Sequence, residues 1–181
     1  MRLFIAVFPP ANVQQVAHEA AGVLRVTDPK VSWVRPENLH YTMRFLGECE
    51  ADARVHAEEA MRVAAGKHTR FGVALGGFGA FPAAKRARVL WLGMLQGAEP
   101  MRQLAESLDQ ALLRKGFEPA EETFEPHLTV ARVRTPADWT ERLIEASSPE
   151  ARFQLDKLVL VQSALGPGGA RYQVLAEAEL G

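Results

Sequence analysis

The sequence has very little cysteine and almost no net charge. Cys49 is the single cysteine of the 181-residue chain, so a disulfide within one chain and a thiolate metal cluster are both excluded. The formal net charge is −1, so the molecule as a whole does not attract polyanions. A nucleic-acid ligand would therefore have to be held locally, by a few Arg or Lys side chains.

Long hydrophobic runs are also missing. The first residues, MRLFIAVFPP, contain an apolar run from Leu3 to Phe8 that Pro9 and Pro10 end. This run is too short for the core of a signal peptide or for a membrane span. The sequence predicts a soluble, cytoplasmic protein without a membrane partner. With 48% hydrophobic and 24% charged residues, the chain can bury a core as one domain over residues 1–181.

The chain follows one plan twice, at a shift of 82 to 87 residues. In the first half, Leu3–Phe8 predicts a buried strand, residues 11–25 and 52–65 predict helices, and residues 71–81 predict a strand that enters a glycine-rich turn. In the second half, residues 89–94 predict a strand, residues 100–115 a helix, and residues 153–163 a strand. A short helix is expected after Thr135, with Thr135 as N-cap and Pro136 at its first position. We expect two similar lobes, residues 1–85 and 86–181, that could exchange their terminal strands.

Each half carries a His-x-Thr motif inside a short apolar run. The motifs are NLHYTMRF with His40 and Thr42, and EPHLTVAR with His127 and Thr129, so the two histidines are 87 residues apart. Alternate side chains of a strand share a face, so each His and its Thr point the same way while Tyr41 and Leu128 point into the lobes. A lone histidine in such a strand would be taken for a core or cleft residue. Two at matching points of a repeat indicate one shared site.

Two imidazoles and two hydroxyls are suited to acid–base chemistry on a phosphate. Because histidine titrates near neutral pH, one ring can carry a proton while the other lacks it. The threonine hydroxyls can donate hydrogen bonds to an anionic oxygen between the rings. The motif faces carry no carboxylate and too few ligands for a metal, so we expect neither a metal nor another cofactor. Neither Cys49 nor a Gly-x-Ser-x-Gly elbow indicates a nucleophilic triad, and the stretch GGFGAF is not followed by the helix of a dinucleotide loop.

The sequence resembles the two-histidine phosphoesterases, and among them the RNA 2′,3′-cyclic phosphodiesterases, also called 2′-5′ RNA ligases. The similar pieces are RLFIAVFPP, ENLHYTMRFLGE, LGGFGAFP, RVLWLGM, PHLTVAR and the closing LVQSALGPGGARYQVL, which together span nearly the whole chain. The resemblance implies an α+β, bilobal fold in which two antiparallel, pseudo-symmetric sheets line a central cleft with helices outside. It also implies metal-independent hydrolysis of 2′,3′-cyclic phosphates at RNA 3′ ends, which leaves a 2′-phosphate.

The same resemblance implies roles for individual residues. His127 would be the base and His40 the acid, Thr42 and Thr129 would hold the phosphate, and Arg132 would contact it too. Strict alternation places Arg132 on the face opposite His127, so it reaches the cleft only if the strand ends or bulges there. Arg44 shares the face of His40 and is the alternative.

Other functions stay open at this point. The joining of RNA by 2′-5′ bonds is the reverse chemistry, and a non-catalytic RNA- or nucleotide-binding module or a structural protein with this fold would carry the same residues. The expected ligands are RNA 3′ ends or small cyclic nucleotides, and we expect a monomer without an obligate protein partner. The physiological RNA and the base preference do not follow from the sequence.

Overall fold

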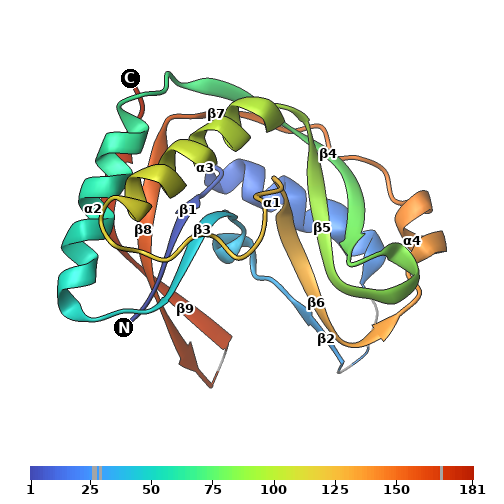
Figure 1. The fold of residues 1–181 in the computed structure, drawn as a ribbon. Helices are drawn as coiled ribbons and strands as arrows, with labels where there is room; N and C mark the ends of the chain where they lie inside the picture. Colours follow the sequence, from blue (N-terminus) through green and yellow to red (C-terminus); the bar gives the residue numbers. More distant parts are fainter. Residues whose placement is uncertain (26–27, 29, 168) are drawn as a thin grey trace.

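Two antiparallel sheets form the frame of the molecule (Figure 1), in a computed structural model that describes residues 1–25, 28, 30–167 and 169–181. Sheet A has the order β3-β1-β8-β9, with strands β1 (Arg2–Val7), β3 (Tyr41–Glu48), β8 (Lys157–Gly166) and β9 (Gly169–Glu179). Sheet B has the order β2-β6-β5-β4-β7, with strands β2 (Val31–Trp33), β4 (Phe71–Phe81), β5 (Ala87–Gln96), β6 (Leu128–Ala137) and β7 (Arg152–Leu155). The predicted α+β class with two antiparallel sheets is confirmed.

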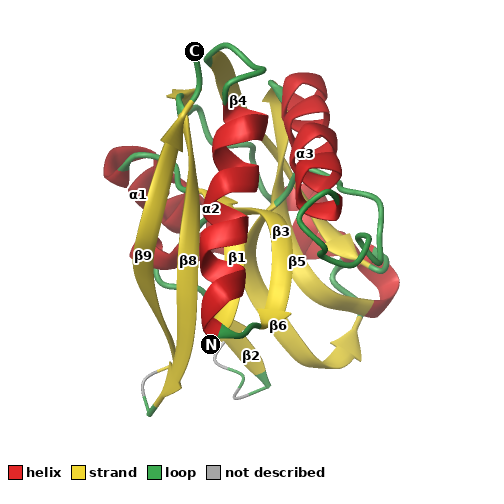
Figure 2. Cartoon of the chain, turned by 60° about the vertical axis from the view of Figure 1, so that its left-hand side comes forward, coloured by secondary structure: helices red, strands yellow, loops and turns green. Residues whose placement is uncertain are grey.

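The helices follow the predicted apolar periodicity. They are α1 (Ala11–Ala20), α2 (Ala51–Ala65), α3 (Ala98–Leu113) and α4 (Thr140–Glu145), with short 3₁₀ turns η1 (Ala21–Leu24), η2 (Pro36–Asn38) and η3 (Ala84–Arg86). Helices α2 and α3 lie side by side (Figure 2), and α2 also contacts β8 and β9. The helix α3 ends before Gly116, whose φ of +87° a glycine adopts without strain.

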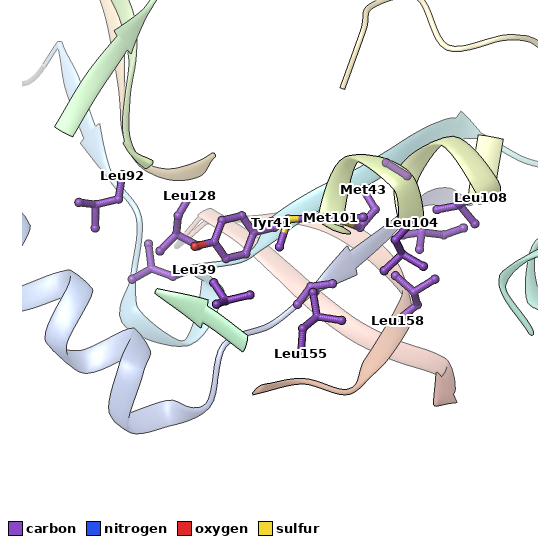
Figure 3. Packing of buried hydrophobic residues seen from close by; sticks show 14 of the residues in the cluster. Leu39, Tyr41, Met43, Leu92, Met101, Leu104, Leu108, Leu128, Leu155 and Leu158 are labelled. Atoms are coloured by element: carbon purple, nitrogen blue, oxygen red, sulfur yellow. The ribbon is translucent and has the colours of Figure 1, made fainter. Parts of the chain in front are cut away.

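One hydrophobic core joins the helices to both sheets. Met43, Met101, Leu104, Leu108 and Leu158 pack closely where α3 meets sheet A (Figure 3). The same core continues past Tyr41 to Leu92 and Leu128 of sheet B. A smaller second cluster, made of Phe4, Ala6, Val159 and Val161, covers the other face of sheet A, so β1 is buried on both faces.

Each sheet takes strands from both halves of the chain. The strand β4, near the end of the first half, pairs with β5 of the second half. The strand β8, near the end of the second half, pairs with β1 of the first. In each sheet a motif strand lies next to the first strand of its own half, since β3 pairs with β1 and β6 pairs with β5. The two arrangements β3-β1-β8 and β6-β5-β4 are therefore equivalent, which brings the two motif strands to equivalent places.

Three local predictions were wrong. Residues 153–163 form no single strand, because the chain leaves β7 of sheet B and enters β8 of sheet A within this range. The glycine-rich stretch is no turn but the C-terminal half of β4. Glycine is needed there because β5 lies close: a Cβ on Gly79 would lie 2.3 Å from the Trp91 ring. Thr135 is no N-cap, since β6 continues to Ala137, which pairs with Ala87. Helix α4 starts only at Thr140, whose N–H donates to the Asp138 carboxylate at 2.9 Å.

Candidate active site

His40 lies immediately before β3, between a backbone carbonyl and a hydroxyl. Its Nδ1 is 2.7 Å from the carbonyl oxygen of Asn38, and its Nε2 is 2.9 Å from Oγ1 of Thr42. A carbonyl can only accept, so Nδ1 carries the proton and donates it. In the neutral ring Nε2 is then an acceptor, to which the Thr42 hydroxyl donates. The motif thus fixes both the tautomer and the orientation of the ring.

His127 repeats this arrangement immediately before β6. Its Nδ1 donates to the carbonyl oxygen of Glu125 at 2.7 Å, again two residues earlier in the chain. This hydrogen bond leaves Nε2 for a ligand, whereas Nε2 of His40 accepts from the Thr42 hydroxyl. The edge of the Phe81 ring packs on the imidazole, with 4.9 Å between the ring centroids. The two histidines thus have the same tautomer, set by the same backbone bond, on two different sheets.

Aromatic rings surround His40 on the inner face of sheet A, which is the face that carries the smaller cluster with Phe4 and Ala6. The ring centroids of Phe4, Phe8 and Tyr172 lie 5.0, 5.2 and 5.4 Å from that of the imidazole. This burial lowers the pKa of His40, because it disfavours the charged ring, and the charges of Arg132 and His127 lower it further. The Asn38 carbonyl opposes the shift. His127 and Arg132 are therefore close enough to His40 for their charges to act on it, although they belong to the other sheet.

An irregularity in β6 turns Arg132 toward this region. Leu90 pairs with Ala131, whereas Trp91 pairs with Thr129, so Val130 is an extra residue in β6. Val130 and Ala131 are both buried, and the side chains that follow change face. Arg132 thereby comes to the same face as Thr129, and its charge lowers the pKa of His40. The arginine that the alternation placed on the far side of the strand thus lies on the face of Thr129, within electrostatic reach of His40.

A matching irregularity in β3 turns Arg44 away. Ala6 pairs with Thr42, but Ile5 pairs with Arg44, so Met43 is the extra residue. The Arg44 guanidinium forms an ion pair with Asp109 of α3 and donates to the carbonyl of Glu118. The side chain of Arg44 is 10% exposed. Its charge is thus compensated on the helix side of sheet A.

Two hollows meet at His127. The smaller is lined by Phe78, Phe81, Trp91 and Met94 of sheet B. The larger, of about 1360 Å³, begins at Thr42 and His127 and runs outward between β3 and the segment 116–125. Its outer part is rich in carboxylates, from Glu48, Glu50 and Asp52 on one side and Glu118, Glu121 and Glu122 on the other. The site is therefore electropositive at Arg132 and acidic at the far end of the large hollow.

Sequence reasoning missed the aromatic side chains around the histidines. Phe4, Phe8 and Tyr172 surround His40, and Phe81 touches His127. The alternation of Phe4, Ala6 and Phe8 in the first strand could have indicated a face that contacts the site. It was hidden because every residue of this strand is apolar, which is typical of a strand buried on both faces.

Within the described ranges, no group of three or more His, Cys, Asp or Glu side chains could hold a metal ion. In that same part of the chain, no helix is both long and apolar enough to cross a membrane.

Comparisons with known proteins find relatives over nearly the whole chain. Residues 5–167 match the model of the 2′-5′ RNA ligase superfamily. A protein of Thermotoga maritima named RNA 2′,3′-cyclic phosphodiesterase is 33% identical, over 99% of this chain and 95% of its own length. The crystal structure of the Thermus thermophilus protein TT0787 is similar with a TM-score of 0.83 at 29% identity, covering 99% of this chain and 98% of that one. Escherichia coli LigT complexed with 3′-AMP is similar with a TM-score of 0.78 at 26% identity, covering 99% and 97%.

Proposed function

Because the chain belongs to the 2′-5′ RNA ligase superfamily, we propose that it hydrolyses the 2′,3′-cyclic phosphate at RNA 3′ ends to a 2′-phosphate, with two histidines and without a metal ion. Relatives over nearly the whole chain are named RNA 2′,3′-cyclic phosphodiesterase. The observation that carries the mechanism is the matched hydrogen bonding of His40 and His127, whose Nδ1 atoms both donate to the carbonyl two residues earlier.

The reaction is an in-line displacement at phosphorus. A water molecule attacks, its proton passes to one imidazole, and the bond from phosphorus to O3′ breaks. The other imidazole protonates O3′, so the product has a 3′-hydroxyl and a 2′-phosphate. Because Nδ1 of each ring donates to a carbonyl, Nε2 is the atom that takes or gives the proton. Such a transfer contributes typically ~10²–10⁴-fold in rate.

We assign His127 as the base and His40 as the acid. This assignment follows the resemblance to the two-histidine phosphoesterases. Burial lowers the pKa of His40, so the ring must gain its proton when the anionic phosphate binds beside it and favours the charged form. Thr129 donates to a phosphate oxygen, and Thr42 does the same by exchanging its hydrogen bond to Nε2 of His40 for one to the phosphate. Arg132 supplies the positive charge that compensates the phosphate, which is the task a metal ion performs in other phosphoesterases.

The function is tested with an oligonucleotide that ends in a 2′,3′-cyclic phosphate, incubated with the protein in EDTA. The expected product carries a 2′-phosphate. A product with a 3′-phosphate would mean that the ribose binds in the opposite orientation. Binding without turnover would instead favour a nucleotide-binding module, and 2′-5′ joined products in excess of hydrolysis would favour the ligase.

The two roles are tested with a substrate whose 3′-oxygen is replaced by sulfur, a leaving group that hardly needs a proton. The defect of His40→Ala should then shrink strongly, whereas that of His127→Ala should persist. Rescue of His127→Ala instead would reverse the assignment.

A further inference from the structure

The inner face of sheet A continues beyond His40 to an exposed aromatic ring. Phe45 is directly opposite Phe4 in the β1–β3 pairing, and Thr42 is directly opposite Ala6. Residues opposite one another in antiparallel strands share a face, so Phe45 lies on the side of the sheet where Phe4 contacts His40. Yet Phe45 is 50% exposed, and it lines the large hollow together with Thr42 and His127. It is thus a half-open ring on the face that leads to the histidine pair.

The guanidinium of Arg2 lies over this ring, with Cζ 5.0 Å from the Phe45 centroid. No ion pair of Arg2 occurs among residues 1–25, 28, 30–167 and 169–181, and its cross-strand neighbour Glu48 is paired with the N-terminal ammonium at 3.6 Å. Arg2 is opposite Ser163, which is in turn opposite Tyr172. The charge of Arg2 is therefore free to act on an anion bound along this face.

Tyr172 lies between the Arg2–Phe45 pair and His40. Its ring packs edge-on against His40 at 5.4 Å. Burial raises the pKa of Tyr172, and the charges of Arg132 and Arg2 lower it. Two arginines thus lie within electrostatic reach of one tyrosine, Arg132 on the side of sheet B and Arg2 on the side of Phe45. Positive charge is therefore present on both sides of Tyr172 along this face.

This combination suits single-stranded RNA. Unpaired bases stack on aromatic rings and on guanidinium planes, and each phosphate that follows needs a cation. Glu48, opposite Arg2, is paired with the N-terminal ammonium, whereas Glu50 and Asp52 in the outer part of the large hollow would repel the same strand. The charges therefore favour a path over Arg2 and Phe45 and oppose one along the carboxylates.

We propose that Phe45 and Arg2 form a subsite for the nucleotide that precedes the cyclic-phosphate end, so that the preferred substrate is an RNA oligonucleotide and not a cyclic mononucleotide. This proposal rests on the proposed function. The base of the preceding nucleotide stacks on the Phe45–Arg2 pair, and the phosphate that joins it to the terminal ribose lies against the guanidinium.

The test compares kcat/KM for a 2′,3′-cyclic mononucleotide with that for a dinucleotide with the same cyclic end. Phe45→Ala and Arg2→Gln should each lower the ratio of dinucleotide to mononucleotide activity by about 10-fold, as expected for one lost stacked base or phosphate contact. Phe45→Trp should keep the ratio. Arg2→Gln should also reduce the salt dependence of oligonucleotide binding, by a slope of about 0.7.

Matched controls come from surfaces away from this face. Leu95→Ala removes a 74% exposed side chain of β5, and Arg70→Gln removes a cation that pairs with Glu179. Both should leave the ratio unchanged, and thermal unfolding should show that all variants are folded. If Phe45→Ala affects both substrates equally, or neither, the subsite does not exist. If the wild-type protein hydrolyses neither substrate, the proposed function itself has failed. The subsite is then tested by binding: if Phe45→Ala binds a 2′-phosphorylated dinucleotide as tightly as the wild type does, the subsite is overturned as well.

Discussion

His40 lies among three aromatic rings, whereas one ring touches His127. Burial lowers the pKa of His40 below the usual value of ~6.5, and the charge of Arg132 acts in the same direction. The imidazole of the free protein should therefore be neutral at neutral pH. An anionic ligand between the histidines should move this pKa upward. NMR titration of the His40 ring, without and with a 2′-nucleotide, measures both shifts. A free pKa above 6.5, or a ligand that lowers it, would contradict this account of the site.

The threonine hydroxyls are expected to act through hydrogen bonds and not through packing. Thr42→Ser and Thr129→Ser keep the donor, whereas Thr42→Val and Thr129→Val keep the shape and remove it. Losing one hydrogen bond to a charged group costs about 1.5–3 kcal/mol, so the valine variants should lose roughly 10- to 100-fold in kcat/KM. Serine variants should stay close to the wild type. Valine variants that keep the wild-type rate while the serine variants lose activity would show that the methyl group, and not the hydroxyl, is what matters.

At the scale of the strand, an extra residue in each motif strand decides the direction of an arginine. Val130 in β6 brings Arg132 to the face of Thr129, while Met43 in β3 sends Arg44 to Asp109. Arg132 lies on the face of the site, whereas Arg44 is paired on the helix side of sheet A. Removal of Arg132 should therefore affect turnover, and removal of Arg44 should affect stability. Arg132→Ala should lower kcat/KM roughly 10- to 100-fold, as one lost charge-assisted contact implies, with little change in the free energy of unfolding.

Arg44→Ala should instead destabilise the fold by about 1–2 kcal/mol, because Asp109 loses a largely buried partner. The loss stays this small because the Asp109 side chain is 30% exposed and remains partly solvated. Urea unfolding and steady-state kinetics on the same two variants separate the effects. The account of the strand irregularities is wrong if Arg44→Ala abolishes turnover with unchanged stability while Arg132→Ala only destabilises.

The strands also show how far sequence reasoning reaches. Apolar periodicity predicted the helices and most strands, and alternation correctly placed Tyr41 and Leu128 in the core. The register that sets Arg132 depends on how β6 pairs with β5, which no local pattern encodes. The same holds for Gly79: its role is to admit the Trp91 ring from the neighbouring strand, so the sequence alone could not distinguish it from a turn glycine. For Thr135, the cap signals were present, but pairing of Ala137 with Ala87 kept the chain extended.

At the scale of the whole molecule, the two halves are joined by exchanged strands and one core. Two strands of the first half pair with strands of the second half: β4 pairs with β5 and β7, and β1 pairs with β8. We therefore propose that residues 1–181 fold as one cooperative unit. Residues 1–85 expressed alone should lack a folded structure by NMR, and the whole chain should unfold in a single transition. A well-dispersed spectrum of the fragment would show that the first half is an independent domain.

The most direct test of the central claim is single-turnover cleavage of a cyclic-ended oligonucleotide in EDTA by His40→Ala, His127→Ala and the double variant. If the two histidines act as one acid–base pair, each single variant should lose at least ~10²-fold, and the double variant should lose little more than the worse single one. Far-UV spectra should stay native. A single variant with nearly the wild-type rate, or a loss of wild-type activity in EDTA that a divalent ion restores, would contradict the paired-histidine mechanism.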